Sequence, residues 1–189
     1  MLDPGKRAIV RGAPGARVLT CEWEVYVRDD SAQVARRTRD ETIEALASFP
    51  DELERLVLRG HADAQLRQPA SDGGWGVVEI LPHLRDWEVI YLERVEKILA
   101  EGHPDLPGFD DTLWSIERDY RGQDPRATFE ELKATRARLV VLISAVTPED
   151  WERTGQHSYY GDITLSWLLD HICDHDHEHL EQARDALSG

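Results

Sequence analysis

Apolar residues recur at steps of three and four along four stretches of the chain, which is the period of an amphipathic α-helix. The first stretch begins near Ala32 and contains Pro50, which predicts either a kink or the start of a second helix. The second covers residues 77–101. The third covers residues 125–146, and we expect Asp124 to cap it and Pro125 to be its first residue. The fourth follows Thr164, which we expect to cap it. Four long helices with short or medium connections predict an all-α fold, a four-helix bundle.

The beginning of the chain does not share this helical period. Positions 19–27 alternate apolar and polar side chains, as a β-strand does, and residues 7–10 could pair with them across a turn. We therefore divide the chain into an N-terminal extension, residues 1–37, and a bundle domain, residues 38–189. The extension is expected to be either a β-hairpin or disordered. Within the bundle domain, Gly155 to Asp162 is expected to be a loop.

Length and charge narrow the class of protein. The 189 residues suit one domain with a sizeable core, and the formal net charge is −15. Such an acidic chain lacks the basic surface that nucleic acid requires, so we expect no nucleic-acid partner. No apolar run reaches the ~20 residues of a membrane span, and the start lacks a secretory signal, so we expect a cytoplasmic protein without a membrane partner. Cys21 and Cys173 lie far apart and do not indicate a disulfide framework.

The histidines of the last predicted helix are the clearest chemical signal. Four of the eight histidines lie within residues 170–182. On a helix, His171, His175 and His179 form one stripe, whereas His177 points about 200° away from His175. A His-x-x-x-His pair on a helix can bring two imidazole nitrogens to one metal ion. A third ligand must then come from another element.

His83 is the histidine placed to complete such a site. It lies in the second predicted helix, beside an apolar face that comprises Ile80, Leu84 and Trp87. The histidines outside both helices fall in predicted loops: His61, His103 and His157. Three imidazoles with an open fourth position form a reactive metal site rather than a closed structural one. A histidine beside a core face can also be a hydrogen-bonded structural residue, and this alternative stays open for His83.

Three segments resemble the motifs of DinB-like proteins and occur in the same order as in that family. The first runs from Trp75 to Glu88 and contains a His-Leu-x-Asp-x-Glu run. The second, residues 147–165, resembles the family's linker before the last helix. The third, His175 to Gln182, resembles its closing His-x-x-x-His-x-x-Gln motif. The resemblance covers about residues 38–187 and leaves the N-terminal extension without a counterpart.

The resemblance implies a bundle of the DinB-like type that binds a divalent metal ion, commonly zinc or nickel, through His83, His175 and His179. It also implies homodimers. The wider superfamily includes thiol-dependent S-transferases and a mycothiol-dependent maleylpyruvate isomerase. Two functions therefore stay open. One is a metal-dependent S-transferase or isomerase that uses a low-molecular-weight thiol and an electrophilic substrate. The other is a non-catalytic metal-binding module for stress response or partner binding.

Residues near the expected site allow more than one role. His171 is a fourth ligand, a hydrogen-bond donor to a ligand, or a packing residue. Asp86 and Glu178 either act as a general base or orient an imidazole, or they are exposed helical charges. Gln182 lies seven residues after His175, about 20° away around the helix axis, so it is expected to face the same cavity. Cys173 points about 200° away from His175, so we do not expect it to bind the same ion.

Overall fold

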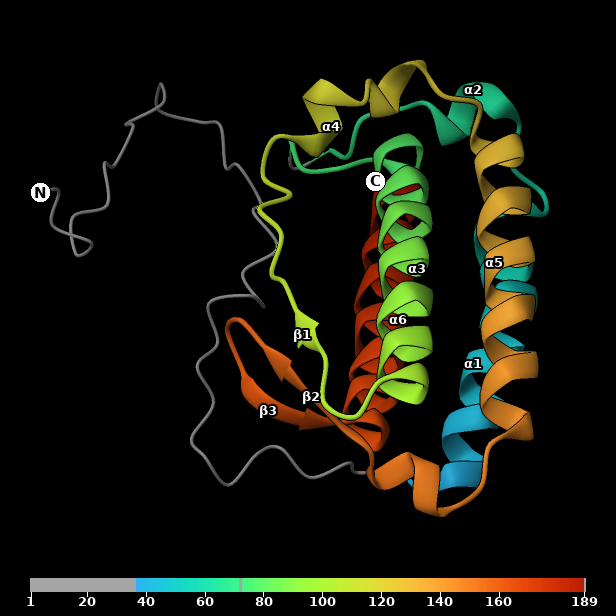
Figure 1. The fold of residues 1–189 in the computed structure, drawn as a ribbon. Coiled ribbons are helices and arrows are strands. Elements are labelled where there is room, and N and C mark those ends of the chain that lie inside the picture. Colours follow the sequence, from blue (N-terminus) through green and yellow to red (C-terminus); the bar gives the residue numbers. More distant parts are fainter. Residues whose placement is uncertain (1–36, 72, 189) are drawn as a thin grey trace, which may run out of the picture.

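The computed structural model describes residues 37–71 and 73–188 and confirms the four-helix bundle (Figure 1). Its long helices are α1 (Arg39–Leu53), α3 (Val77–Ala100), α5 (Pro125–Ala145) and α6 (Leu165–Ser188). Helices α1 and α6 run in one direction, and α3 and α5 run in the other. The strand predicted over residues 19–27, and all of the predicted extension except residue 37, lie outside the described residues.

The first helix starts later than its apolar pattern indicated. Thr38 and Glu41 form a capping box, so α1 begins directly after Thr38 rather than near Ala32. Pro50 lies inside the helix and does not open a second one. A π-helical segment, Glu54–Leu58, continues the helix four residues after this proline. The prediction of the helix was therefore correct, but the prediction of its start was wrong.

The caps of the third and fourth predicted helices form as the sequence indicated. The Asp124 side chain accepts a hydrogen bond from the backbone N–H of Ala127, and Pro125 is the first residue of α5. The Thr164 hydroxyl accepts a hydrogen bond from the backbone N–H of Trp167 and so caps α6. These local contacts set the residue at which each of the two helices begins.

The segment expected to be a loop before α6 is mostly a β-hairpin, so that prediction was wrong. Strand β2 (Thr154–His157) pairs antiparallel with β3 (Gly161–Thr164), and β1 (Asp105–Leu106) pairs parallel with β2. The strands have two to four residues, too few for their alternation to be visible in the sequence. The sheet lies beside the ends of α3 and α6 (Figure 1).

The connections between the long helices contain four further short helical segments. The segment that follows α1 includes α2 (Asp63–Leu66), and α4 (Trp114–Glu117) precedes a 3-10 turn at Tyr120–Gly122. A 3-10 helix, Glu149–Glu152, follows α5. No helix in the described part of the chain is long and apolar enough to cross a membrane.

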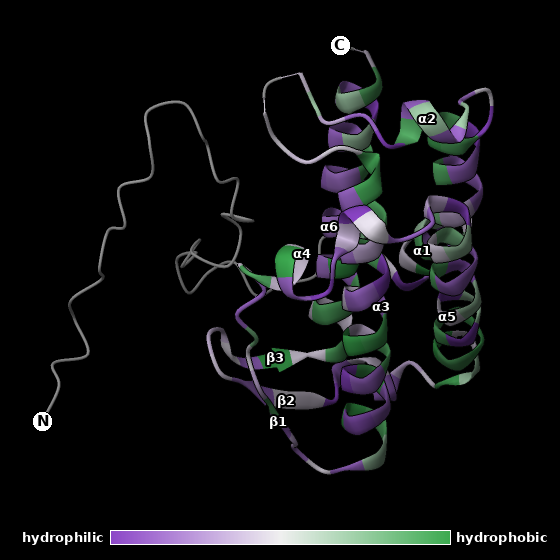
Figure 2. Cartoon of the chain, turned by 90° about the horizontal axis from the view of Figure 1, so that it is seen from above, coloured by the Kyte–Doolittle hydropathy of each residue, from purple (hydrophilic) through white to green (hydrophobic). Residues whose placement is uncertain are grey.

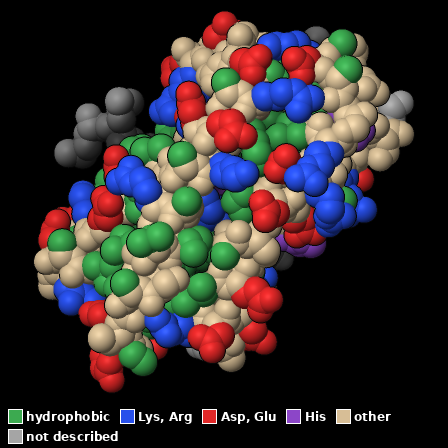
Figure 3. Space-filling model, turned by 90° about the vertical axis from the view of Figure 1, so that its right-hand side faces the viewer, with side chains coloured by type: hydrophobic (Ala, Val, Ile, Leu, Met, Phe, Trp, Pro, Cys, Tyr) green, Lys and Arg blue, Asp and Glu red, His purple; other side chains and the backbone are tan. Residues whose placement is uncertain are grey.

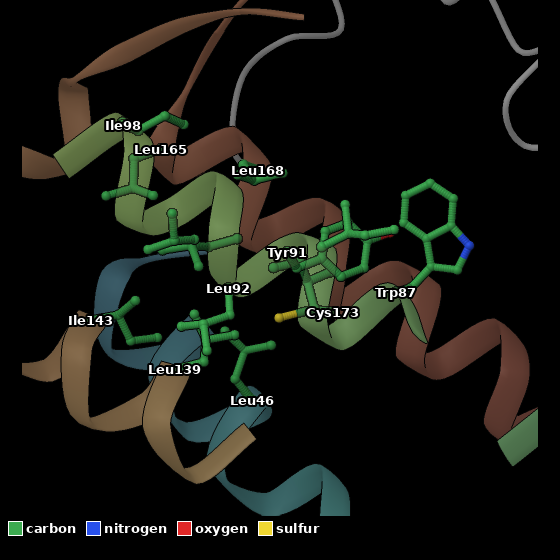
Figure 4. Packing of buried hydrophobic residues seen from close by; sticks show 14 of the residues in the cluster. Leu46, Trp87, Tyr91, Leu92, Ile98, Leu139, Ile143, Leu165, Leu168 and Cys173 are labelled. Carbon is green, nitrogen blue, oxygen red and sulfur yellow. The ribbon is translucent and has the colours of Figure 1, made fainter. Parts of the chain in front are cut away.

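The four helices bury one face each. Helices α1 and α3 both pack against α5 and α6, so α5 and α6 lie at opposite corners of the bundle (Figure 1). Hydrophobic and hydrophilic residues alternate along each helix (Figure 2), and the apolar side chains meet in the interior. Leu46, Leu92, Leu139 and Leu168, one from each long helix, belong to the same buried cluster (Figure 4). This packing sets α3 and α6 side by side, as the candidate site requires.

Candidate metal centre

Helices α3 and α6 bring three imidazoles together inside the bundle. We refer to His83, His175 and His179 as the histidine centre. The Nε2 atoms of His83 and His175 lie 3.3 Å apart, and the ring of His179 lies within 4.6 Å of both other rings, centroid to centroid. One nitrogen from each ring lies within 4.8 Å of the corresponding atoms of the other two. The structure thus brings together the three residues that the sequence predicted as ligands.

Burial keeps these imidazoles uncharged. Each of the three side chains is almost completely buried. Removal from water lowers the pKa of His83 and of His175 well below 6.5, and the neighbouring imidazoles lower it further. Burial also lowers the pKa of His179 to about 4. All three rings are therefore neutral at pH 7, which is the state that donates a lone pair to a metal ion.

Gln182 fixes the tautomer of His179. The Nδ1 atom of His179 lies 2.8 Å from Oε1 of Gln182. A carbonyl oxygen only accepts hydrogen bonds, so Nδ1 carries the hydrogen and Nε2 keeps the lone pair. Metal-binding histidines are commonly oriented in this way by a group that accepts from their second nitrogen. The structure places Gln182 beside the site, as expected from its helical angle.

Asp111 lies near Nδ1 of His83, on the side of the ring away from the centre. The sequence did not predict this neighbour. One of its carboxylate oxygens lies 3.7 Å from Nδ1 of His83 and accepts a hydrogen bond of 2.9 Å from Nε1 of Trp87. A distance of 3.7 Å is too long for a hydrogen bond, but the carboxylate still favours a hydrogen on the near nitrogen. Asp111 lies in a Gly- and Pro-rich connection, where no periodicity indicates that it would turn toward His83.

The remaining histidines of the chain's last helix stay outside the centre. His171 shares the stripe, but its ring stacks on Trp167, with 5.0 Å between centroids and an interplanar angle of 8°. His177 is exposed on the opposite side of α6. His157, expected in a loop, is buried in β2 and accepts a hydrogen bond from the backbone N–H of Tyr159. The position of His171 matches the packing role among its three possible roles.

The other candidates from the sequence lie outside the converging group. Asp86 accepts hydrogen bonds from Nη1 of Arg118 at 2.6 Å and from the hydroxyl of Tyr120 at 2.8 Å. It therefore secures the connection between α3 and α5 rather than an imidazole. Glu178 is exposed. Cys173 is buried in the core, where burial raises the pKa of its thiol to about 12, and it lies outside the converging group.

A pocket of about 370 Å³ opens beside the histidine centre. The last turns of α6 and the connection before α3 form its walls, and Gln182 and Trp75 belong to both the pocket and the surroundings of the centre. Gln182 bonds to His179, and the ring of Trp75 lies 5.0 Å from that of His83. The pocket thus reaches the histidine centre through these two side chains, which separate it from His179 and His83.

The donor set fits a divalent metal ion. It consists of three neutral nitrogen ligands, held by two packed helices and converging in the buried interior. Imidazole suits zinc, nickel, copper and iron, and a set of three ligands leaves a coordination position open. Within residues 37–71 and 73–188, this is the one group of three or more such side chains whose donor atoms converge.

Comparison with known proteins gives consistent results. Residues 35–183 match the sequence profile of the DinB superfamily. "Putative metal-dependent hydrolase YfiT" of Bacillus subtilis is 28% identical over 148 residues, which are 78% of this chain and 83% of that protein. A protein of Geobacillus thermodenitrificans, also named as a putative metal-dependent hydrolase, is 30% identical over 65% of this chain and 68% of its own length.

A solved structure agrees with the fold. The structure of YfiT from Bacillus subtilis, described as having an unusual four-helix bundle topology, aligns with a TM-score of 0.73 at 26% identity. The alignment covers 85% of this chain and 91% of YfiT. The metal dependence in the names of these relatives and the three converging imidazoles point to the same kind of site.

Proposed function

Because this chain belongs to the DinB superfamily, we propose that it is a metal-dependent enzyme whose ion is held by His83, His175 and His179. The observation that carries the proposal is the convergence of three buried, neutral imidazoles within 4.8 Å. Zinc and nickel are the ions we propose, since both bind imidazole nitrogen. When bound, a divalent ion supplies Lewis-acid chemistry that lowers the pKa of a water or a thiol.

The chain's own residues prepare this chemistry. Gln182 and Asp111 favour a hydrogen on the outer nitrogens of His179 and His83, which turns both Nε2 lone pairs inward. The surrounding apolar side chains exclude water and strengthen electrostatic interactions in the centre. The pocket between Trp75 and α6, one side chain away from the imidazoles, gives a small substrate room to bind.

We propose that the nucleophile is a low-molecular-weight thiol, which makes the protein an S-transferase or an isomerase acting on an electrophile. Within the described residues, the converging donor group contains imidazoles alone and no carboxylate. A thiol ionises near pH 8.5 and needs no strong base, whereas a hydrolytic metal site of the His-Glu-x-x-His type uses a glutamate as general base. A thiol nucleophile therefore does not depend on the carboxylates nearby, which are Asp111 behind His83 and Glu178, Glu181 and Asp185 in the pocket lining.

Hydrolysis is the second candidate, and the names of the relatives favour it. In this case the nucleophile is water, and the same histidine centre holds the ion. The two candidates differ in the co-substrate they require, because a transferase is inactive without added thiol. They share the requirement for metal.

Metal content tests the ligand set first. His83→Ala should reduce bound metal from one ion per chain to nearly none, because two imidazoles remain on one helix. His177→Ala should keep the full ion, because this residue is exposed outside the centre. Both variants are measured by elemental analysis beside the unchanged protein, and circular dichroism confirms that they fold. Full metal in His83→Ala, or its loss in His177→Ala, contradicts the ligand set.

An activity screen then separates the candidates. The metal-loaded protein is incubated with cysteine or glutathione and a chromogenic electrophile, and separately with nitrophenyl esters without thiol. Thiol conjugation that chelator and His83→Ala abolish supports the transferase. Metal-dependent ester cleavage without thiol supports the hydrolase. An ion bound with neither activity supports a non-catalytic metal-binding module.

We also propose that the protein forms a homodimer, as its family resemblance implies. Light scattering on the purified protein should give twice the 21.6 kDa of one chain. A mass of one chain at micromolar concentration contradicts the dimer without affecting the metal site.

A further inference from the structure

One arginine in the bundle interior contacts all three of the other long helices. Arg136 of α5 is 1% exposed. Its guanidinium donates to the carboxylate of Glu88 on α3, to the carboxylate of Asp176 on α6 and to the carbonyl oxygen of Leu46 on α1. Charged side chains of this protein otherwise mostly lie at the surface, as the mixed acidic and basic groups in Figure 3 show. An arginine at this position therefore requires an explanation.

The geometry of these contacts is specific. Nε and Nη2 donate to the two oxygens of Glu88 at 2.7 and 2.6 Å, and Nη1 and Nη2 donate to the two oxygens of Asp176 at 2.7 and 3.0 Å. Nη1 also donates to the carbonyl of Leu46 at 3.3 Å. All five N–H groups of the guanidinium thus have acceptors. We call Arg136, Glu88 and Asp176 the Arg136 clasp.

The Arg136 clasp binds both helices that carry the proposed metal ligands, α3 and α6, at positions close to those ligands. Asp176 directly follows His175 and precedes His179 by three residues, and Glu88 follows His83 by five. One turn of helix is 3.6 residues, so both carboxylates lie within about one and a half turns of the imidazoles on their helix. The clasp also joins α5 to α6, which lie at opposite corners of the bundle.

Apolar packing alone does not set helix positions this closely. Hydrophobic contacts are non-directional, and cores accept many rearrangements of similar volume. Two bidentate ion pairs on one planar guanidinium are directional, because a rotation or slide of either helix breaks bonds. Metal ligands, by contrast, must be held within about 0.5 Å of their productive positions.

We propose that Arg136 is a positioning residue for the histidine centre. Its two bidentate pairs set the rotation and height of α3 against α6, so that the imidazole of one helix meets the two imidazoles of the other. The proposal rests on the proposed function, because it concerns the site at which we place the ion. Its competitor is a purely structural role, in which the clasp contributes to folding and nothing else.

A triple variant separates the two roles. Replacing a buried charge cluster completely with apolar side chains often leaves stability unchanged or raised, whereas removing one member leaves uncompensated charge. We therefore combine Glu88→Met, Arg136→Met and Asp176→Leu. Urea unfolding reports stability, and titration with Co²⁺ reports affinity and, through the visible absorption bands, coordination geometry.

If Arg136 positions the ligands, the triple variant should unfold near the original urea midpoint but bind Co²⁺ about 10- to 100-fold more weakly, with altered bands. Arg136→Lys keeps the charge without the planar fork and should show the same altered bands with a smaller loss of affinity. Arg138→Met, on the same helix, is the matched control, because Arg138 is exposed and pairs with Glu96 at 3.6 Å. It should change nothing.

Unchanged affinity and unchanged bands in a folded triple variant overturn the proposal. If that variant does not fold, Arg136→Lys decides alone, and an unaltered Co²⁺ spectrum in this variant overturns it equally. A wild-type protein that binds no Co²⁺ and carries no other metal refutes the proposed function instead, and this outcome is visible before any variant is made.

Discussion

The bundle interior holds two polar centres on the same pair of helices, and they are built in opposite ways. In the histidine centre, three neutral imidazoles turn nitrogen atoms toward one another within 4.8 Å. In the Arg136 clasp, a guanidinium and two carboxylates meet through four hydrogen bonds of 2.6 to 3.0 Å. Burial lowers the pKa of every imidazole in the first centre, and the carboxylates raise the pKa of Arg136 in the second.

The difference separates a site that can bind a metal ion from a site that fixes the positions of helices. A buried polar group is costly unless it has a partner. The clasp supplies its own partners, since every guanidinium N–H reaches an acceptor, so it has nothing to offer a ligand. In the histidine centre, Nε2 of His83 and Nε2 of His175 lie 3.3 Å apart and share a hydrogen bond, which a bound cation would replace. The same helices therefore carry a closed structural centre and an open chemical one.

The largest expected effect on stability comes from replacing a single charged residue of the Arg136 clasp. Arg136→Met leaves the carboxylates of Glu88 and Asp176 buried without their cation, and we expect it to lower the free energy of unfolding by about 3–5 kcal/mol. Glu88→Gln should cost less, because it leaves one balanced pair. Urea unfolding at pH 7 measures both. An Arg136→Met variant as stable as the unchanged protein would contradict the charged state of the clasp.

The second-largest expected effect is a loss of folding stability at low pH, caused by the imidazoles of the histidine centre. Unfolded histidines take up protons near pH 6.5, whereas the pKa of His179 in the folded chain is about 4. Protons therefore favour the unfolded chain between these values, and the metal-free protein should lose stability as pH falls from 6.5 to 4. For His179 alone the loss is on the order of 3 kcal/mol. About 2 kcal/mol of this loss has occurred at pH 5, and urea midpoints at pH 7 and pH 5 measure that part.

Low pH changes the stability contribution of the Arg136 clasp in the opposite direction. Burial raises the pKa of Asp176 to about 6, so this carboxyl favours the folded state as pH falls below 6. The three imidazoles outweigh it, and the net effect is loss of stability. His179→Gln should flatten the pH dependence, whereas His177→Gln, an exposed matched control, should leave it unchanged. Equal slopes in both variants would remove the histidine centre as the source of the acid response.

The histidine centre could be predicted from the sequence because its signals are local. The spacing of His175 and His179 places them on one face of a helix, and the apolar neighbours of His83 place it toward the interior. The caps at Asp124 and Thr164 were predicted for the same reason, since a cap involves residues two or three apart. Local periodicity is sufficient wherever partners lie within one helix.

The clasp, the sheet and Asp111 could not be predicted, because their partners are distant in sequence. Arg136 pairs with residues 40 and 48 positions away, and the sequence around it does not distinguish it from exposed Arg138. Strand β1 pairs with β2 across about fifty residues, Asp105 opposite Gln156. Such contacts depend on how helices pack, and packing is visible only in the folded chain.

A smaller effect is expected from the group that orients a ligand. Gln182→Ala removes the acceptor on Nδ1 of His179 and should weaken metal binding by about 10- to 100-fold, the range found for such partners. Gln182→Glu keeps an acceptor and should bind at least as tightly as the unchanged protein. Competition with a chromogenic chelator gives both affinities. Equal affinity in all three proteins would show that Gln182 does not orient the imidazole.

The smallest effect is expected from replacing His171. This replacement tests whether every histidine of the stripe binds the ion or only those that converge in the structure. His171 lies one turn before His175 on the same face of α6, so helical spacing alone permits it as a fourth ligand. Its ring instead stacks on Trp167 and lies outside the converging group. His171→Phe keeps an aromatic ring for this stacking and should retain one ion per chain with unchanged affinity, as elemental analysis and chelator competition will measure. Loss of the ion in His171→Phe, with the fold intact by circular dichroism, would mean that the stripe contributes three ligands and that the histidine centre extends one turn further along α6.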